Sequence, residues 1–156
     1  GEGQFAPVDL VQVVQNCCFS RLAQARSKAI DLGYDGRQQP VMIEGEEVLL
    51  GELCANLLEN AIKYTPAEGT VTVFLRTDQG AVELSVEDSG PGIEEDQIQQ
   101  AMLPFHRLDN VGDAAGSGIG LALAGDIARL HRSHLQLNRS ESLGGLCVKM
   151  RFLLLA

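Results

Sequence analysis

The sequence has no tryptophan, few other aromatic residues and no long hydrophobic run. Aromatic residues make up 4% of the 156 residues, and no apolar stretch approaches the ~20 residues of a membrane-spanning helix. The first residues lack the basic start and apolar stretch of a signal peptide, and residues 1–6 are interpreted as a cloning scar or linker remnant. Since 45% of the residues are hydrophobic, residues 7–156 are expected to form one domain with its own core.

Basic residues are also scarce. The chain has 12 lysines and arginines against 21 acidic residues, which gives a formal net charge of -9. A surface this acidic repels nucleic acid and anionic lipid, so we expect no nucleic-acid partner. A nucleotide could still bind, with local help from a metal ion, a few basic side chains or backbone amides.

Cysteine pairs with metal-binding spacing are absent as well. The four cysteines lie at positions 17, 18, 54 and 147, and none forms a C-x-x-C pair. The three histidines are not spaced with them as zinc ligands. Buried, reduced thiols in a reducing compartment are therefore the expected state.

Hydrophobic periodicity predicts three helices and five strands. The helices are expected at residues 8–30, 46–64 and 119–130. The strands are expected at residues 41–43, 71–77, 82–87, 133–140 and 146–155. Gly33 is expected to end the first helix, and Asp78-Gln79-Gly80 to close a hairpin. Helices packed on one mixed, mostly antiparallel sheet place the chain in the α+β class, as a two-layer sandwich.

A polar face runs along the second predicted helix. Its residues, which lie three and four positions apart, are Asn56, Asn60, Lys63 and Tyr64. Asparagine is a poor helix former and is unfavourable to bury without a partner. Two stacked asparagines suggest a hydrated magnesium ion and phosphates as ligands, with Lys63 reaching phosphate oxygens. The alternative is a solvated polar face, which this helix alone would favour.

A carboxylate ends the inward-facing row of the strand at residues 82–87. Val82, Leu84 and Val86 face inward by the period of two, and Asp88 continues this row. A buried carboxylate needs a donor, for which the exocyclic amine of adenine and a neighbouring loop are the candidates. The glycines of Asp88-Ser89-Gly90-Pro91-Gly92-Ile93 allow the backbone to approach a flat ligand closely, so the sequence favours the adenine.

A second glycine cluster, Gly116-Ser117-Gly118-Ile119-Gly120-Leu121, opens directly into the third predicted helix. Free N–H groups and the positive end of the helix dipole make phosphate its natural ligand. The pattern alone is weak, because flexible linkers look similar. The irregular residues before it suggest a lid over the ligand. Phe105 would contact apolar surface, and Arg107 would form an ion pair with phosphate. An ordinary exposed loop is the alternative.

These pieces, in this order, resemble the ATP-binding catalytic domain of bacterial sensor histidine kinases. That domain has the Bergerat fold of the superfamily shared with gyrase, MutL and a heat-shock chaperone. The segments that carry the resemblance are NLLENAIKYT at 56–65 (N box), DSGPGI at 88–93 (first glycine box), FHR at 105–107 (end of the F box) and GSGIGL at 116–121 (second glycine box). The resemblance covers the chain from Pro7 onward.

The resemblance implies ATP and Mg²⁺ as ligands and a role for each motif residue. Asn60 would hold magnesium with help from Asn56, and Lys63 and Arg107 would contact phosphates. The nucleotide would also meet Tyr64, Asp88 as acceptor for the adenine amine, Gly90 and Gly92 at the base, and Gly116, Gly118, Gly120 and Leu121 at the lid.

Asn56 bears on the type of reaction. The ATP hydrolases of this superfamily have a glutamate four residues before the metal-binding asparagine, where it activates water. An amide cannot accept a proton, so the chain is better suited to hand the phosphate to a nucleophile such as histidine. Glu59, next to Asn60, is turned away from that face and is expected to be an exposed helix charge.

Other features depart from the family pattern. The F box is thin, with His106 and Leu108 in place of aromatic residues, and His131-Arg132-Ser133 stands where His-Gly-Gly is common, so a distorted turn is expected. None of the three histidines has the setting of a phosphoacceptor. His106 lies in the expected lid, and His131 and His134 are expected in solvent or capping positions at the end of the third helix. The resemblance thus implies a separate histidine-containing dimerisation domain, a response regulator as downstream partner, a monomeric fragment, and a parent protein in the inner membrane with this domain in the cytoplasm. An anti-sigma-type serine kinase and a degenerate module that only senses ATP are the alternatives.

Overall fold

A mixed sheet of five strands forms one layer of this computed structural model, which describes residues 4–94 and 117–156. Its strands, in spatial order, are β2 (Asp31–Gly36), β4 (Thr70–Asp78), β5 (Ala81–Asp88), β7 (Leu146–Leu153) and β6 (Gln136–Arg139). β2 pairs with β4 in parallel, and the other neighbours are antiparallel. The predicted sheet type is confirmed.

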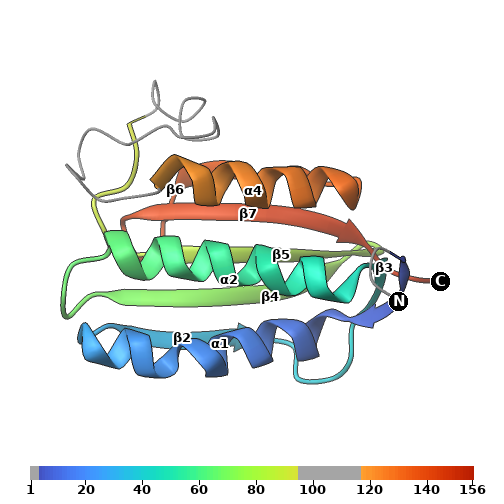
Figure 1. Ribbon diagram of the computed structural model, residues 1–156, viewed down its shortest axis with the longest axis horizontal. Helices are drawn as coiled ribbons and strands as arrows, with labels where there is room; N and C mark the ends of the chain where they lie inside the picture. Colours follow the sequence, from blue (N-terminus) through green and yellow to red (C-terminus); the bar gives the residue numbers. More distant parts are fainter. Residues whose placement is uncertain (1–3, 95–116) are drawn as a thin grey trace.

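Three helices in the described part of the chain cover one face of this sheet (Figure 1). They are α1 (Leu10–Ser27), α2 (Glu47–Tyr64) and α4 (Ser117–Leu130). α2 packs against both α1 and α4. Its apolar stripe, with Leu50, Leu53 and Leu57, is buried over the inward-facing residues of the strands, such as Leu84. The α+β sandwich is therefore confirmed, with the core between the two layers.

The chain near its start departs from the prediction of one helix at residues 8–30. β1 (Ala6–Asp9) precedes α1 and pairs with β3 (Met42–Gly45) in a small antiparallel sheet. Asp9 ends β1 and caps α1, because its carboxylate accepts from the N–H of Val11. The helix then stops at Ser27, followed by Ala29 at φ 60°.

Gly33, which was expected to end that helix, lies instead within the strand β2. The residues of β2, DLGYDG, include two glycines and two aspartates, which are poor strand formers. The strand exists because the backbone of β4 supplies a parallel hydrogen-bonding partner. This tertiary contact has no signal in the local sequence.

The remaining elements agree with the prediction to within a few residues. The hairpin between β4 and β5 turns at Gln79 and Gly80, which both have positive φ, as a type I′ turn requires. Arg132 in the turn after α4 has φ 60°, a conformation that glycine adopts most readily. The expected distortion of this turn stays a prediction. In the described ranges, no helix combines the length and apolarity needed to cross a lipid bilayer.

The course of the helices decides where a ligand site can form. α2 ends and α4 begins at the same edge of the molecule, on the left in Figure 1. β5 ends and β7 begins at the same edge, also on the left in Figure 1, and Glu87 pairs with Cys147 there. Two helix ends and two strand ends therefore lie together at one edge of the domain.

Candidate functional site

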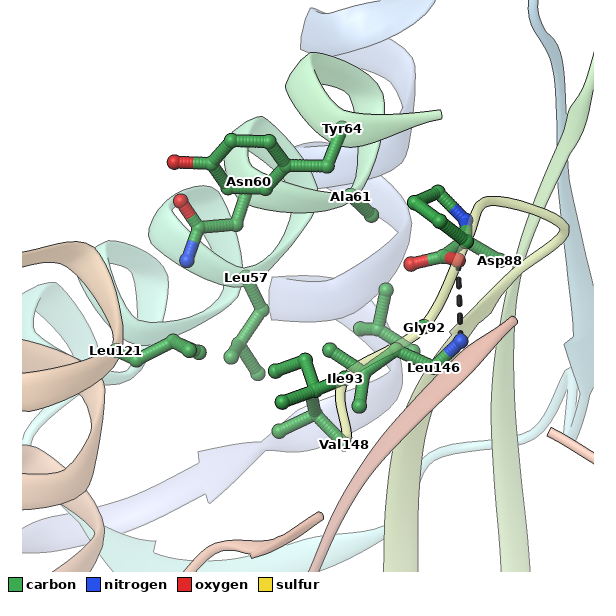
Figure 2. A pocket seen from close by; sticks show the side chains of 12 residues that line it. Leu57, Asn60, Ala61, Tyr64, Asp88, Gly92, Ile93, Leu121, Leu146 and Val148 are labelled. Atoms are coloured by element: carbon green, nitrogen blue, oxygen red, sulfur yellow. Dashed lines mark hydrogen bonds between the residues drawn. The ribbon is translucent and has the colours of Figure 1, made fainter. Parts of the chain in front are cut away.

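A pocket lies where these four elements meet (Figure 2). Its walls are mostly apolar, with Leu57 and Ala61 from α2, Ile93 from the loop after β5, and Leu121, Leu146 and Val148 opposite. Its polar side chains are Asn60, Tyr64 and Asp88. Apolar walls with a few fixed polar groups are typical of sites for small organic molecules.

Asp88 is the buried carboxylate of this pocket. Its residue is 6% exposed and ends the inward row of β5, so the predicted orientation is confirmed. Oδ1 accepts from the N–H groups of Gly90 at 2.9 Å and Leu146 at 3.1 Å. No described residue donates to Oδ2, and Figure 2 shows this oxygen pointing into the pocket. One oxygen thus fixes the side chain, and the other remains as an acceptor.

The surroundings of Asp88 also affect its protonation. Burial raises the pKa of the carboxyl above its ordinary value of 3.8, and the N–H groups of Leu146 and Gly90 oppose this shift. Desolvation is the larger cause. The site therefore holds a carboxylate that gains from any further donor that a ligand offers.

Glycines allow the backbone to pack tightly around Asp88. A Cβ atom on Gly145 would collide with the carboxylate and carbonyl of Asp88 and lie 2.6 Å from the nitrogen of Gly90. One on Gly90 would come 2.9 Å from the carbonyl oxygen of Tyr64. Gly92 has φ 77°, a conformation that other residues rarely adopt. The loop that frames the pocket therefore requires glycine at these three positions.

Asn60 lies one turn before the end of α2, and its side chain lines the pocket (Figure 2). Its Nδ2 is buried, and no acceptor among the described residues reaches it. An unsatisfied buried amide is unfavourable, and few occur in native structures. The position therefore suits a ligand that brings hydrogen-bonding atoms of its own.

Comparison with known proteins identifies the family of this chain. A family model described as histidine kinase-, DNA gyrase B- and HSP90-like ATPase matches residues 45–156. The chain belongs to this ATPase family. Its membership supports nucleotide binding by the domain.

Several curated relatives of this ATPase domain are sensor proteins. The sensor protein CutS of Streptomyces coelicolor is 31% identical over 92% of this chain, and the sensor protein kinase PmrB of Pseudomonas aeruginosa is 31% identical over 94%. The chain spans 35% and 30% of the length of these two relatives.

Solved structures agree with the fold of the domain. The mycobacterial sensor histidine kinase MprB is 27% identical, with a TM-score of 0.81 over 97% of this chain and 98% of that one. The catalytic domain of histidine kinase ThkA, at 20% identity, has a TM-score of 0.84 over 96% and 95% of the two chains. At 20% identity, the similarity to ThkA supports the fold and nothing further.

The structure brings together some of the residues predicted for the site of this ATPase domain. Asn60, Tyr64, Asp88, Gly92 and Leu121 line the pocket, and Gly90 lies directly behind it. The other two residues of the polar helix face do not line it. Asn56 is half-buried, and Lys63 is exposed, with its Nζ 5.6 Å from the centre of the Tyr64 ring.

The predictions for the second glycine box lie partly beyond what the structure describes. Gly118 and Gly120 belong to the first turn of α4, where only the backbone is described. Arg107, Phe105, His106 and Gly116 lie outside the described residues. Their predicted roles in a lid and in phosphate binding stay predictions.

Two polar residues away from the pocket have structural partners. Glu59 forms an ion pair with Arg21 of α1 at 2.6 Å, which agrees with the expectation that it faces away from Asn60. His131 was placed in a solvent or capping position, but it is buried. Its Nε2 accepts from the N–H of Glu46 and its Nδ1 contacts the carbonyl oxygen of Ile127.

Sequence reasoning missed several residues that shape the pocket. Gly145 and Leu146, which hold Asp88, were not among the predicted site residues, and position 146 was expected only to begin a strand. The Gly-Gly pair directly before a strand was a signal, since one glycine suffices for the turn and the second points to a close backbone contact. Leu57, Ala61, Val86 and Val148 look like ordinary core residues in sequence.

Proposed function

We propose that this chain is the Mg-ATP-binding catalytic domain, residues 7–156, of a sensor histidine kinase. It would pass the terminal phosphate of ATP to a histidine on a dimerisation domain outside this chain, in two-component signal transduction. The names of the relatives support this proposal. The single observation that carries it is the buried Asp88, whose Oδ2 faces an apolar pocket with no donor from the described residues.

The base of the nucleotide would be recognised by Asp88. Adenine is flat and apolar on its faces and carries an exocyclic amine at its edge, so it matches apolar walls with one acceptor. A carboxylate held by two N–H groups keeps its orientation, and Oδ2 would accept from the amine. Gly90 and Gly92 would let the backbone approach the ring.

Magnesium fits the chemistry of the residues on α2. Mg²⁺ prefers oxygen ligands and often keeps waters and nucleotide phosphates in its shell. The amide of Asn60 can offer its oxygen to such a hydrated ion while the buried Nδ2 donates to a phosphate or a water. The described residues contain no cluster of three His, Cys, Asp or Glu side chains that could hold a metal ion. The ion would arrive with the nucleotide, whose phosphates would supply further oxygen ligands. Bound magnesium would neutralise phosphate charge.

The basic residues and Asn56 define the rest of the proposed chemistry. Lys63, exposed beside Tyr64, is free to swing toward phosphates, and Arg107 and the glycines at 116, 118 and 120 would act from the lid. Asn56 cannot activate water as a glutamate would, which favours transfer over hydrolysis. The site residues act by binding and positioning, since a neutral imidazole is already nucleophilic.

The phosphate acceptor would lie outside this chain. Both ring nitrogens of His131 are engaged in buried contacts, so His131 is unsuited to this role. Relatives about three times as long leave room for a dimerisation domain and a sensor. We propose a response regulator as downstream partner, a monomeric state for this fragment, and a position on the cytoplasmic side of the inner membrane for the domain.

Calorimetry with ATP in the presence and absence of Mg²⁺ tests the proposal. We expect the wild-type domain to bind ATP, Asp88→Ala to abolish binding, and Asn60→Ala to remove the dependence on Mg²⁺. Addition of a histidine-containing dimerisation domain should then yield a phosphohistidine. No binding at millimolar ATP would sink the nucleotide site, and tight binding without transfer would favour a module that only senses ATP.

A further inference from the structure

Lys28 bridges two helices at the edge where the pocket lies. It caps the C-terminus of α1, and its Nζ donates to the carbonyl oxygens of Ile62 at 2.9 Å and Lys63 at 2.7 Å. These carbonyls belong to the last turn of α2, where helix geometry leaves four carbonyls without intrahelical donors. The N–H of Thr65 donates to the carbonyl oxygen of Ala61, and Lys28 donates to the next two carbonyl oxygens along the helix.

The turn that carries Lys28 is itself fixed. The carbonyl of Ala29 accepts from the N–H of Glu68 at 2.8 Å, and the N–H of Asp31 donates to Gly69 at 2.9 Å. These bonds attach the loop after α2 to the start of β2. A cation at a helix C-terminus also interacts favourably with the helix dipole. Lys28 therefore holds the end of α2 from a rigid base.

The end of α2 is in contact with the group that holds Asp88. The carbonyl oxygen of Tyr64 lies so close to Gly90 that a Cβ there would come within 2.9 Å of it. The N–H of Gly90 in turn donates to Asp88 Oδ1. A displacement of the last turn of α2 would therefore move both Tyr64 in the pocket wall and the backbone donor of Asp88.

We propose that Lys28 is a positioning residue for nucleotide binding. It acts through the last turn of α2, whose carbonyls it binds, and neither of the two residues that it binds, Ile62 and Lys63, lines the pocket. The proposal rests on the proposed function of the pocket. Its mechanism is placement of the helix end, so removal of the ammonium should weaken nucleotide binding even though the domain stays folded.

Calorimetric titration of the domain with Mg-ADP at low and high ionic strength tests this role. We expect Lys28→Met to weaken binding about tenfold, which corresponds to about 1.4 kcal/mol, because the end of α2 loses the charged donor that fixes it. The loss should persist at high salt, because a positional effect is not screened. Lys28→Arg, which keeps the charge and the donors, should restore most of the affinity.

Arg21→Met is the matched control. Arg21 also joins α1 to α2, through its ion pair with Glu59, but it does so on the side away from the pocket. We expect this variant to lower the melting temperature and leave the affinity for Mg-ADP within about twofold. Should Lys28→Met fail to fold, Lys28→Gln, whose amide reaches one carbonyl, replaces it with a smaller loss expected.

Several outcomes would overturn the role of Lys28. They are unchanged affinity in Lys28→Met, a loss that disappears at high salt, as expected of simple attraction for phosphate, and an equal loss in Arg21→Met. If the wild-type domain itself binds no Mg-ADP, the proposed function fails instead. Binding by the wild type together with equal binding by Lys28→Met refutes the positioning role alone.

Discussion

Two buried polar side chains, Asp88 and His131, lie at opposite ends of the domain. They differ in how many of their hydrogen-bonding atoms have partners among the described residues. Asp88 lies at the end of β5 near the pocket, and one of its oxygens accepts two hydrogen bonds while no described residue donates to the other. His131 follows α4 at the opposite edge, near β3. Its Nε2 accepts from Glu46 N–H at 3.1 Å, and its Nδ1 lies 2.8 Å from the carbonyl oxygen of Ile127.

The aromatic neighbours of His131 complete its environment. Its ring stacks on Phe5 with 4.8 Å between centroids and meets Phe152 edge-on at 6.2 Å. With both nitrogens bonded, the ring has no polar atom left for a further hydrogen bond, and Phe5 covers one of its faces. A neutral ring with its proton on Nδ1 satisfies both contacts.

The difference separates a structural polar group from a functional one. Burial of a polar group is tolerated when its hydrogen bonds are satisfied within the fold, as for His131. Asp88 and Asn60 retain unused capacity, and both point into one pocket. A buried polar atom without a hydrogen-bond partner lowers the stability of the fold. Such atoms are therefore expected where a bound ligand supplies the missing partner. The predictions below test whether the two ends of the domain obey this distinction.

The largest effect is expected for Asp88→Asn. The amide can still accept from Gly90 and Leu146, but it presents an NH₂ donor to the amine of adenine. The affinity for ATP should fall about 10- to 100-fold, the loss of a hydrogen bond to a charged group. The melting temperature at neutral pH should not fall, because no buried charge remains. Calorimetry and thermal melts measure both, and a destabilised variant would show that the charge serves the fold instead.

The pH dependence of stability sharpens the same prediction. Burial raises the folded-state pKa of Asp88, so the folded domain binds this proton more tightly than the unfolded chain. The resulting stabilisation is present below the ordinary value of 3.8 and is lost as the pH rises through the raised folded-state pKa. Asp88→Asn should lack this decline. ATP affinity of the wild type should move oppositely and fall as acid protonates the carboxylate.

Gly145→Ala should damage the pocket through the backbone. The added methyl group would collide with Asp88 and the nitrogen of Gly90, and overpacking of this kind costs about 1–3 kcal/mol. We expect ATP affinity to fall about tenfold, since the acceptor moves away from its partner by a fraction of an ångström. Gly51→Ala is the control, because a Cβ atom at this position of α2 would meet nothing within 4 Å beyond the neighbouring backbone of its own helix. It should raise stability by about 0.5–1 kcal/mol and leave binding unchanged.

His131→Phe tests the other end of the comparison. Phenylalanine keeps the ring between Phe5 and Phe152 but removes the acceptor that Nε2 offers to Glu46 N–H. The free energy of unfolding should fall by about 1–3 kcal/mol, the cost of leaving a buried donor unserved. ATP affinity of the folded domain should not change. His134→Phe, on an exposed neighbour, should alter neither quantity, and a loss of ATP binding in His131→Phe would remove the distinction between the two ends.

The sequence predicted the layers and the central hairpin because their signals are local. The stripe of α2 and the alternation in β4 and β5 follow from side-chain burial alone, and Gln79-Gly80 marks the turn. β1 and β2 were missed because pairing with distant strands creates them. Neither DLGYDG nor the short β1 carries enough strand propensity to compete with the helical pattern beside it.

The candidate site was predictable where a residue type conflicts with its surroundings. Asp88 in an apolar row and Asn60 near an apolar stripe are both anomalous in sequence, and both line the pocket. Lys28 and Gly145 were not anomalous, since a lysine at a helix end and a glycine in a turn are ordinary. Their importance comes from contacts with distant residues, Lys28 with Lys63 over 35 positions and Gly145 with Asp88, which only the fold brings together.

The smallest effect is expected for Asn60→Leu in the absence of nucleotide. The buried Nδ2 has no acceptor among the described residues, so its removal should stabilise the domain. Leucine is also a better helix former than asparagine. Asn16→Leu, at an exposed position of α1, gains the same helix propensity and loses only an exposed hydrogen bond from Gln12 Nε2. The difference between the two variants, about 1 kcal/mol in the free energy of unfolding, isolates the penalty of the unsatisfied amide.

With bound nucleotide, Asn16→Leu should become more stable to unfolding than Asn60→Leu. Chemical denaturation with saturating Mg-ATP should stabilise the wild type and Asn16→Leu, whereas Asn60→Leu should gain little, because ligand stabilises a folded state only in proportion to its affinity. If Asn60→Leu were less stable than Asn16→Leu without nucleotide, Asn60 would belong with His131 among the satisfied structural groups. The unused capacity of the pocket would then reduce to Asp88 alone.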